Sequence, residues 1–208
     1  MEKNVFDIYI VGVGGQGVLT IGELIIEAAL KKNIPANFYP TKGMAQRGGF
    51  VKAQLRLGRQ VVGPSIPQKG ADLIIAMERS ESLKAIRYLK CGGDFFLYGS
   101  VWAPTAVMLG KAPYPSLEQV WGNLEQAEAK IAYLDPEMLP QYEGKPVAEN
   151  LFVLGATLGN TALKTLFSAE DLATAITERW PKGAERNLAA FRAGLDIQVC
   201  RSLPVSLG

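Results

Sequence analysis

The feature that most constrains the fold is a glycine-rich segment joining a short apolar run to a longer amphipathic one. Residues 6–13 (FDIYIVGV) are apolar and rich in β-branched side chains, which predicts a buried strand. Residues 12–17 read GVGGQG, and residues 18–32 carry apolar side chains at helical spacing. Glycine permits positive φ and close approach of the backbone, and the N–H groups at a helix start attract phosphate. This order predicts an anion site, with a tight turn that needs glycine only for packing as the alternative.

Strand and helix patterns alternate along the rest of the chain. Strands are predicted at residues 34–39, 50–57, 72–77, 94–98 and 129–134, and helices at 78–89, 151–167, 168–179 and about 181–199. Residues 101–126 are rich in proline and are expected to form loop with short helical pieces. The alternation predicts an α/β fold with a doubly wound, mostly parallel, Rossmann-like sheet and C-terminal helices. We expect one domain at residues 1–200 and a C-terminal tail at 201–208.

Composition excludes several classes of site. The chain has no histidine, which excludes a histidine general base, a Ser-His-Asp triad and a histidine-ligated metal. Cys91 and Cys200 lie far apart and form no CxxC motif, so neither a disulfide framework nor an iron–sulfur site is expected. The net charge is only +2, and no signal-peptide core is present. A run of ~18 apolar residues, which a membrane span needs, is also missing. We therefore expect a cytoplasmic protein that binds neither nucleic acid nor membrane.

The positive charges are unevenly distributed. No Asp or Glu occurs between Ala28 and Ala71, where the cations are Lys31, Lys32, Lys42, Arg47, Lys52, Arg56, Arg59 and Lys69. Such a segment creates a local positive field. It indicates either an uneven solvated surface or a surface that faces an anion or an acidic partner.

The glycine turn by itself does not make a complete dinucleotide site, which also needs a residue that binds the ribose. NAD-binding proteins of this kind carry an Asp or Glu about 20 residues beyond the glycines, where it holds the ribose hydroxyls. The corresponding residues 38–42 read FYPTK and contain no acid, which disfavours NAD. Lys42 could pair with a 2′-phosphate, so NADP stays open.

A second polar, glycine-rich segment follows the second predicted strand. Residues 43–49 read GMAQRGG and should lie at the carboxyl end of that strand, beside the first turn. Arg47 offers a planar fork suited to phosphate or carboxylate. The alternative is an ordinary hairpin-like connection with a solvated arginine.

The two glycine segments, followed by PSIP at 64–67, ADLIIAMERSESL at 71–83 and ENLFVLG at 149–155, carry a family resemblance. From about residue 6 to 195 the chain resembles the gamma-type subunits of 2-oxoacid:ferredoxin (acceptor) oxidoreductases. Among these it is most similar to the small (beta) subunit of indolepyruvate ferredoxin oxidoreductase. Many such subunits have histidine at the position of Lys42, so the oxoacid is left open.

The resemblance implies a complex that converts a 2-oxoacid, coenzyme A and oxidised ferredoxin to an acyl-CoA, CO₂ and reduced ferredoxin. Thiamine diphosphate, Mg²⁺ and iron–sulfur clusters would belong to partner subunits, and ferredoxin would be an indirect partner. This chain would be a non-catalytic or site-completing subunit that is inactive alone, with a homodimer as an option when it is isolated. It implies no catalytic or metal residue here, and the binding candidates are Gly12, Gly14, Gly15, Gln16, Gly17, Lys42, Gly43, Met44, Gln46, Arg47, Gly48 and Gly49.

Two other functions stay open at this point. A stand-alone nucleotide- or NADP-dependent enzyme would need an acid–base residue near the turn, and the candidates are Tyr39, Lys42, Glu78 and Tyr98. A regulatory module would keep the fold without a ligand. Trp102, Trp121 and Trp180 are expected to be core or interface anchors.

Overall fold

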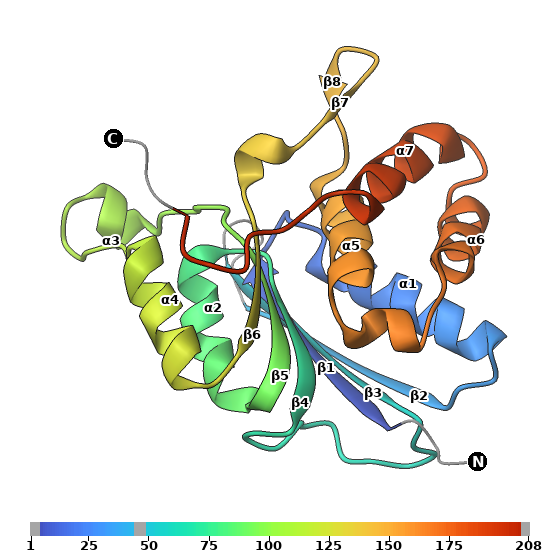
Figure 1. The fold of residues 1–208 in the computed structure, drawn as a ribbon, viewed down its shortest axis with the longest axis horizontal. Helices are drawn as coiled ribbons and strands as arrows, with labels where there is room; N and C mark the ends of the chain where they lie inside the picture. The colour runs from blue at the N-terminus through green and yellow to red at the C-terminus, as the bar shows by residue number, and fades with distance from the viewer. Residues whose placement is uncertain (1–4, 44–48, 205–208) are drawn as a thin grey trace.

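The computed structural model describes residues 5–43 and 49–204, which fold around a six-stranded sheet in the order β2-β3-β1-β4-β5-β6 (Figure 1). The strands are β1 (Phe6–Val13), β2 (Ala36–Lys42), β3 (Phe50–Leu57), β4 (Ala71–Ala76), β5 (Leu89–Tyr98) and β6 (Lys130–Leu134). β1, β4, β5 and β6 pair in parallel, which confirms the mostly parallel α/β sheet. β3 is antiparallel to both β1 and β2 and lies between them, an insertion that the sequence patterns did not predict.

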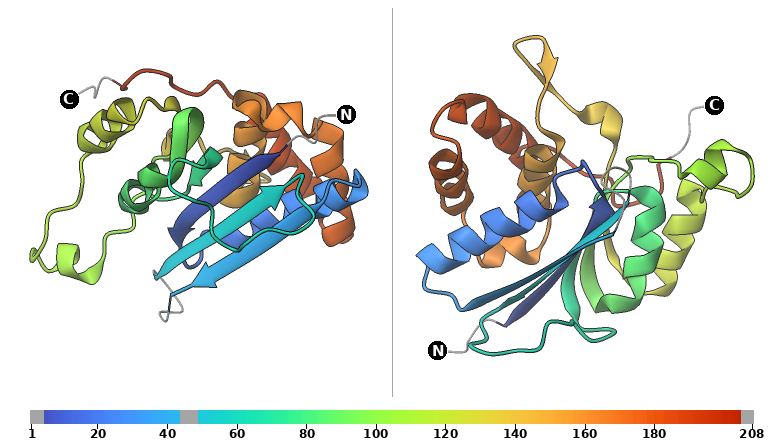
Figure 2. Two further views of the ribbon diagram at one scale, coloured as in Figure 1. Left: turned by 90° about the horizontal axis from the view of Figure 1, so that it is seen from below. Right: turned by 180° about the vertical axis from the view of Figure 1, so that it is seen from behind.

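Two helical layers cover the sheet (Figure 2). One face carries α1 (Val18–Lys31), α5 (Glu149–Asn160), α6 (Ala169–Arg179) and α7 (Ala184–Leu195) over a core that includes Ile8, Ile10 and Leu55. The other face carries α2 (Arg79–Ala85) and α4 (Leu117–Gln126) over a smaller core around Tyr9, Val11 and Trp121. Among the described residues, no helix is long and apolar enough to cross a membrane.

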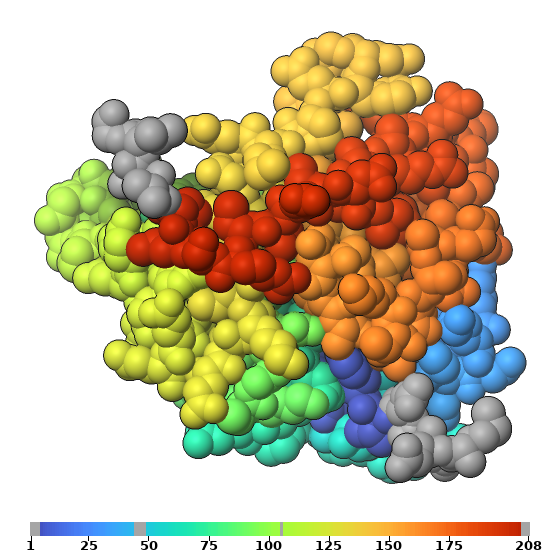
Figure 3. Space-filling view, viewed as in Figure 1, coloured from blue at the N-terminus to red at the C-terminus, as the bar shows by residue number. Residues whose placement is uncertain are grey.

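Short elements complete the chain. They are α3 (Thr105–Met108), 3-10 turns at Ile86–Tyr88, Pro136–Met138 and Ala162–Thr165, and the hairpin of β7 (Gln141–Tyr142) and β8 (Lys145–Pro146). Figure 3 shows this hairpin standing out from the body. After α7 the chain returns to the sheet, where Cys200 pairs with Tyr133 of β6.

Several predicted boundaries were wrong. β2 continues through Pro40, which an edge strand tolerates because one side of its backbone needs no partner. The predicted helix at 151–167 is broken after Asn160, where the Ala162 N–H donates to Asp94 Oδ2 (2.6 Å) and starts a separate turn. The helix expected at 78–89 ends at Ala85, and that expected at about 181–199 spans only Ala184–Leu195.

A capping box is present at the start of α6. The Asp171 N–H donates to Ser168 Oγ (3.2 Å), and the Ser168 N–H donates to Asp171 Oδ2 (2.8 Å). Lys32 also pairs with Asp171 (2.8 Å), which joins the end of α1 to α6.

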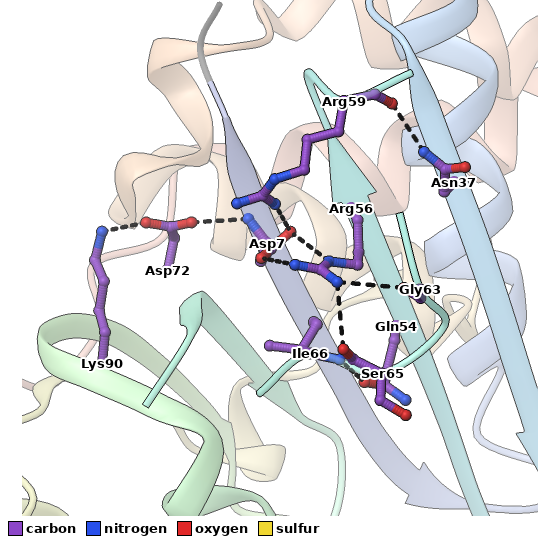
Figure 4. A network of polar contacts seen from close by, with 10 residues as sticks. All are labelled: Asp7, Asn37, Gln54, Arg56, Arg59, Gly63, Ser65, Ile66, Asp72 and Lys90. Carbon is purple, nitrogen blue, oxygen red and sulfur yellow. Dashed lines mark hydrogen bonds and ion pairs between the residues drawn. The ribbon is translucent and has the colours of Figure 1, made fainter. Parts of the chain in front are cut away.

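A cluster of charged side chains lies at the amino ends of the parallel strands (Figure 4). The buried Asp7 carboxylate of β1 accepts from Arg56 Nη2 (3.1 Å) and Arg59 Nη1 (2.6 Å). Arg56 also donates to the carbonyls of Gly63 (3.2 Å) and Ser65 (3.3 Å), which fixes the loop that includes the PSIP segment. These two arginines therefore stabilise the fold. They lie at the amino end of β1, opposite the end that carries the glycine turn.

Candidate anion-binding site

The GVGGQG turn leaves β1 at the carboxyl edge of the parallel strands and leads directly into α1. Gly15 (φ 107°) and Gly17 (φ 73°) lie in the left-handed region, which favours glycine. Gly12 has a packing reason, because a Cβ there would lie 2.8 Å from Val18 Cγ2 and 2.9 Å from Met77 Cβ. A Cβ on Gly17 would lie 2.8 Å from that of Asn150, at the start of α5. The GVGGQG and ENLFVLG segments are therefore packed against each other.

Gln16 holds the turn in place. Its side chain is buried (3% exposed), and its Oε1 accepts from the Val13 N–H (3.0 Å). Its Nε2 donates to the Met77 carbonyl (2.7 Å) and to Ser100 Oγ (3.2 Å). These bonds tie together the carboxyl ends of β1, β4 and β5. In open α/β sheets the ligand crevice lies where neighbouring connections diverge to opposite faces, here between β1 and β4. The Gln16 side chain fills that position.

The open cavity lies instead on the β3 side of the turn. It has a volume of about 360 Å³ and is lined by Val13, Gly14, Gly15, Gly17, Val18, Leu19, Thr20, Lys42, Gly43 and Val51. It therefore brings together glycines of the first segment with Lys42 and Gly43 of the second. Gly49 joins the two segments directly, because its carbonyl accepts from the Gly14 N–H (2.8 Å). Met44, Gln46, Arg47 and Gly48 lie outside the described residues.

The cavity wall offers unpaired backbone donors. Gly17 is the N-cap of α1 and supplies no side-chain cap, and the first turn of α1 has no acid, whereas Ser116 and Ser168 cap α4 and α6. The first N–H groups of a helix have no intrahelical acceptor. Within residues 5–43 and 49–204, the N–H groups of Gly15 and Gly17 have no acceptor either. These donors, the positive end of the helix dipole and the Lys42 ammonium make the cavity suited to an anion.

Sequence reasoning missed part of this wall. Thr20 lines the cavity from the first turn of α1, as do Val18 and Leu19. A helical register counted from Gly17 would have found all of them, because the first three helical positions face an N-terminal ligand.

Three of the four predicted acid–base candidates form hydrogen bonds away from the cavity. Glu78 is fully buried and caps α2, accepting from the Glu81 N–H (2.8 Å), the Trp102 N–H (3.1 Å) and the Tyr114 hydroxyl. The Tyr39 hydroxyl donates to the Val62 carbonyl (2.8 Å). Of the four candidates only Lys42 lines the cavity.

Tyr98 also belongs to a separate pair. Its hydroxyl lies 3.5 Å from Glu149 Oε1, and burial, followed by the charge of Glu149, raises the pKa of Tyr98. Burial likewise raises the pKa of Glu149, against the opposing effect of the Tyr98 hydrogen bond. A tyrosine with a raised pKa stays protonated at neutral pH, so it is a poor general base.

The strand order does not match a dinucleotide site. The ribose-binding acid of such proteins stands at the end of the strand next to β1. Here that neighbour is the antiparallel β3, and the end of β2 is two strand spacings, about 9–10 Å, from the end of β1. The missing acid and the inserted strand both argue against a nicotinamide cofactor.

Four of the eight cations in the basic stretch form local ion pairs. Lys31 pairs with Glu178 (2.5 Å), Lys32 with Asp171, and Arg56 and Arg59 with Asp7. Lys42, Lys52 and Lys69 form no ion pair with the residues that the structure describes. Of these three, Lys42, at the end of β2, lines the cavity.

No metal site accompanies the cavity. Across residues 5–43 and 49–204, no group of three or more His, Cys, Asp or Glu side chains could hold a metal ion. Cys91 and Cys200 are both exposed free thiols.

Comparison with known proteins identifies the family. A family model described as pyruvate ferredoxin/flavodoxin oxidoreductase matches residues 7–197. Indolepyruvate oxidoreductase subunit IorB of Methanothermobacter thermautotrophicus is 33% identical over 190 residues, which cover 91% of this chain and 95% of that protein.

Two solved structures share the fold. Pyruvate oxidoreductase subunit PORC of Thermotoga maritima has a TM-score of 0.68 at 20% identity, covering 94% of this chain and 97% of that one. The 2-oxoglutarate:ferredoxin oxidoreductase of Magnetococcus marinus, with 2-oxoglutarate, coenzyme A and succinyl-CoA bound, has a TM-score of 0.61 at 18% identity. That match covers 93% of this chain and 31% of the longer one. The family match over nearly the whole chain, together with the full-length relative, means that this protein belongs to the pyruvate ferredoxin/flavodoxin oxidoreductase family.

Proposed function

We propose that this chain is the small subunit of an indolepyruvate-type 2-oxoacid:ferredoxin oxidoreductase, and that its glycine turn binds phosphate groups of coenzyme A. The full-length similarity to a protein named as an indolepyruvate oxidoreductase subunit supports the first part. The cavity between the turn and Lys42 carries the second part, because it combines helix N–H donors with a cation. The oxidoreductase from M. marinus has coenzyme A bound, which adds support for this ligand class.

The proposed role of the chain is binding and positioning. The reaction releases CO₂ from the oxoacid, passes two electrons to ferredoxin and transfers the acyl group to the coenzyme sulfur. Thiamine diphosphate with Mg²⁺, and iron–sulfur clusters, would supply the carbanion and electron chemistry from partner subunits. In residues 5–43 and 49–204, no group of three or more His, Cys, Asp or Glu side chains could hold a metal ion. We therefore expect no turnover by the isolated chain.

Phosphate recognition follows from the cavity wall. The N–H groups of Gly15, Gly17 and the first turn of α1 would donate to phosphate oxygens, and the Lys42 ammonium would pair with their charge. Gly14 would act indirectly, because its N–H is already bonded to Gly49. Gln16 would act indirectly too, by fixing the turn through its buried side chain. Arg47, in the second segment, is proposed as a further phosphate ligand.

Calorimetry on the purified chain tests this proposal. Coenzyme A, NADP, NAD and thiamine diphosphate are titrated into the wild type and into Lys42→Ala and Arg47→Ala. Lys52→Ala is the matched control, because Lys52 lines a different cavity, with Tyr9 and Tyr88. A hydrogen bond to a charged group contributes about 1.5–3 kcal/mol, so Lys42→Ala should weaken coenzyme A binding about tenfold or more. Tighter binding of NADP or NAD than of coenzyme A would overturn the proposal. So would equal losses in Lys42→Ala and Lys52→Ala.

A further inference from the structure

A second cavity lies on the face of the sheet that carries α2. Its volume is about 360 Å³, which falls within the range of roughly 300–1,000 Å³ that is typical of small-molecule sites. Three aromatic rings and three cations line it together with Leu83, and they are Tyr9, Phe50, Tyr88, Lys52, Lys84 and Arg87. None of the described residues that line it is acidic. It is called the aromatic cavity below.

The aromatic cavity is separate from the proposed coenzyme site. Phe50 and Lys52 of β3 line the aromatic cavity, whereas Val51, between them, lines the other one. Successive side chains of a strand point to opposite faces of the sheet, so β3 separates the two cavities. The rest of the wall comes from β1, α2 and the turn at Ile86–Tyr88. A ligand in this cavity is therefore independent of a ligand at the glycine turn.

The aromatic rings hold two of the cations in place. Tyr9 and Tyr88 are stacked, with ring centroids 4.6 Å apart and an interplanar angle of 15°. The central carbon of the Arg87 guanidinium lies 5.0 Å from the Tyr88 centroid, and its Nη2 donates to the Tyr88 hydroxyl (3.1 Å). Lys84 Nζ lies 5.3 Å from the centroid of Phe50. The ring faces attract these cations, so the positive charges are positioned along an apolar wall.

Two of the three cations have no carboxylate partner. Lys84 donates to both carboxylate oxygens of Glu81, at 2.7 and 2.8 Å. Lys52 and Arg87 form no ion pair with any residue in the described part of the chain. The aromatic cavity therefore keeps two uncompensated positive charges, one from β3 and one from the turn before β5.

The rings and the charges together select the ligand. An inorganic anion would pair with Lys52 and Arg87 but would leave the ring of Phe50 in contact with water. A planar ring in the ligand can cover that wall, and it can stack on the guanidinium of Arg87. The two oxygens of a carboxylate match the two unpaired cations. Phosphate sites, in contrast, typically use backbone N–H donors at a helix start, and those donors line the other cavity.

We propose that the aromatic cavity binds a small, planar aromatic carboxylate. The carboxylate pairs with Lys52 and Arg87, and the ring lies against Phe50 and the Arg87 guanidinium. This site is additional to the proposed coenzyme site and does not rest on it.

Calorimetry on the purified chain, with 2-naphthoate as the probe, tests the proposal. Saturable binding is expected with a Kd of about 1 mM or tighter. Lys52→Ala and Arg87→Ala should each weaken binding about tenfold or more, because each removes a charged hydrogen-bond donor. Lys52→Arg keeps the charge and should bind within about threefold of the wild type. Lys42→Ala is the matched control, because it removes the same charge from the other cavity, and it should change binding by less than about twofold.

Further probes separate the contribution of the ring from that of the charge. Acetate, which lacks the ring, and 2-naphthol, which lacks the charge, should each bind at least about tenfold more weakly than 2-naphthoate. Thermal unfolding of Lys52→Ala and Arg87→Ala should match that of the wild type, so that a loss of binding reports on the site.

Four results would overturn the proposal. The first is the absence of saturable 2-naphthoate binding, and the second is an equal loss of binding in Lys42→Ala and Lys52→Ala. The third is acetate or 2-naphthol binding as tightly as 2-naphthoate. The fourth is tighter binding of 2-naphthyl phosphate that is lost in Lys52→Ala, because the cavity would then take phosphate esters instead of carboxylates.

Discussion

Replacement of Gly155 by alanine should destabilise the protein by about 2 kcal/mol or more, because α5 and α7 pack through their backbones. A Cβ on Gly155 would lie 2.9 Å from the carbonyl carbon of Phe191 in α7 and closer still to its oxygen. The facing Gly194 is equally tight, since its Cβ would lie 2.7 Å from the Ala156 nitrogen. Neither neighbour is a side chain that could rotate away, so the two helices would have to separate.

The magnitude follows from two opposing effects. Overpacking a close contact costs typically 1–3 kcal/mol, and a backbone-to-backbone contact belongs at about 3 kcal/mol or above. Alanine gains about 1 kcal/mol over glycine in a helix interior, which offsets part of that cost. The net loss of about 2 kcal/mol corresponds to a fall in Tm of roughly 4–8 °C for a chain of this size.

Thermal unfolding followed by circular dichroism measures this loss, with Gly122→Ala as the matched control. Gly122 lies within α4, and a Cβ there would meet nothing within 4 Å. The control keeps the helix-propensity gain without the clash, so its Tm should rise. If Gly155→Ala and Gly122→Ala shift Tm in the same direction, the close α5–α7 packing is not the reason for glycine at position 155.

Three further outcomes are expected. Gln16→Met keeps the side-chain volume but leaves the Val13 N–H and the Met77 carbonyl without their partner. The free energy of unfolding, measured in urea, should therefore fall by about 2–4 kcal/mol. An unfolding free energy equal to that of the wild type would show that Gln16 does not hold the turn in place. Ser168→Ala removes the capping box of α6 and should cost about 1 kcal/mol in the same assay, and an unchanged urea midpoint would refute that estimate. Burial raises the pKa of Glu149, so its contribution to stability is full below its ordinary range and is lost as pH rises through the raised value. Glu149→Gln should therefore be more stable than the wild type at pH 7 and lose that advantage below about pH 4, and stability curves that stay parallel over this range would contradict the shift.

Local sequence patterns predicted most of the strands and helices. They did not predict the order and direction of the strands, which depend on long-range pairing. β1 and the glycine turn are defined by neighbouring residues, and the predicted strand and turn match the structure. The position of β3 depends on strand direction, which an alternating pattern does not encode. One signal was available in the chain, because residues 43–49 are too few for a parallel crossover, which needs a dozen or more residues. That length excluded β2 and β3 as neighbouring parallel strands and favoured the antiparallel pair that the structure shows.

The inserted strand also explains the composition of the candidate site. Since β3 lies between β1 and β2, its start faces the end of β1, and the pairing of Phe50 with Val13 brings the second glycine segment against the first. The hydrogen bond from Gly14 to Gly49 and the position of Lys42 in the cavity wall both follow from that register. The same insertion moves the end of β2 away from the place where a ribose-binding acid would stand. The antiparallel strand therefore places Lys42 and Gly49, and no ribose-binding acid, beside the glycine turn, which is the arrangement that the proposed phosphate site needs.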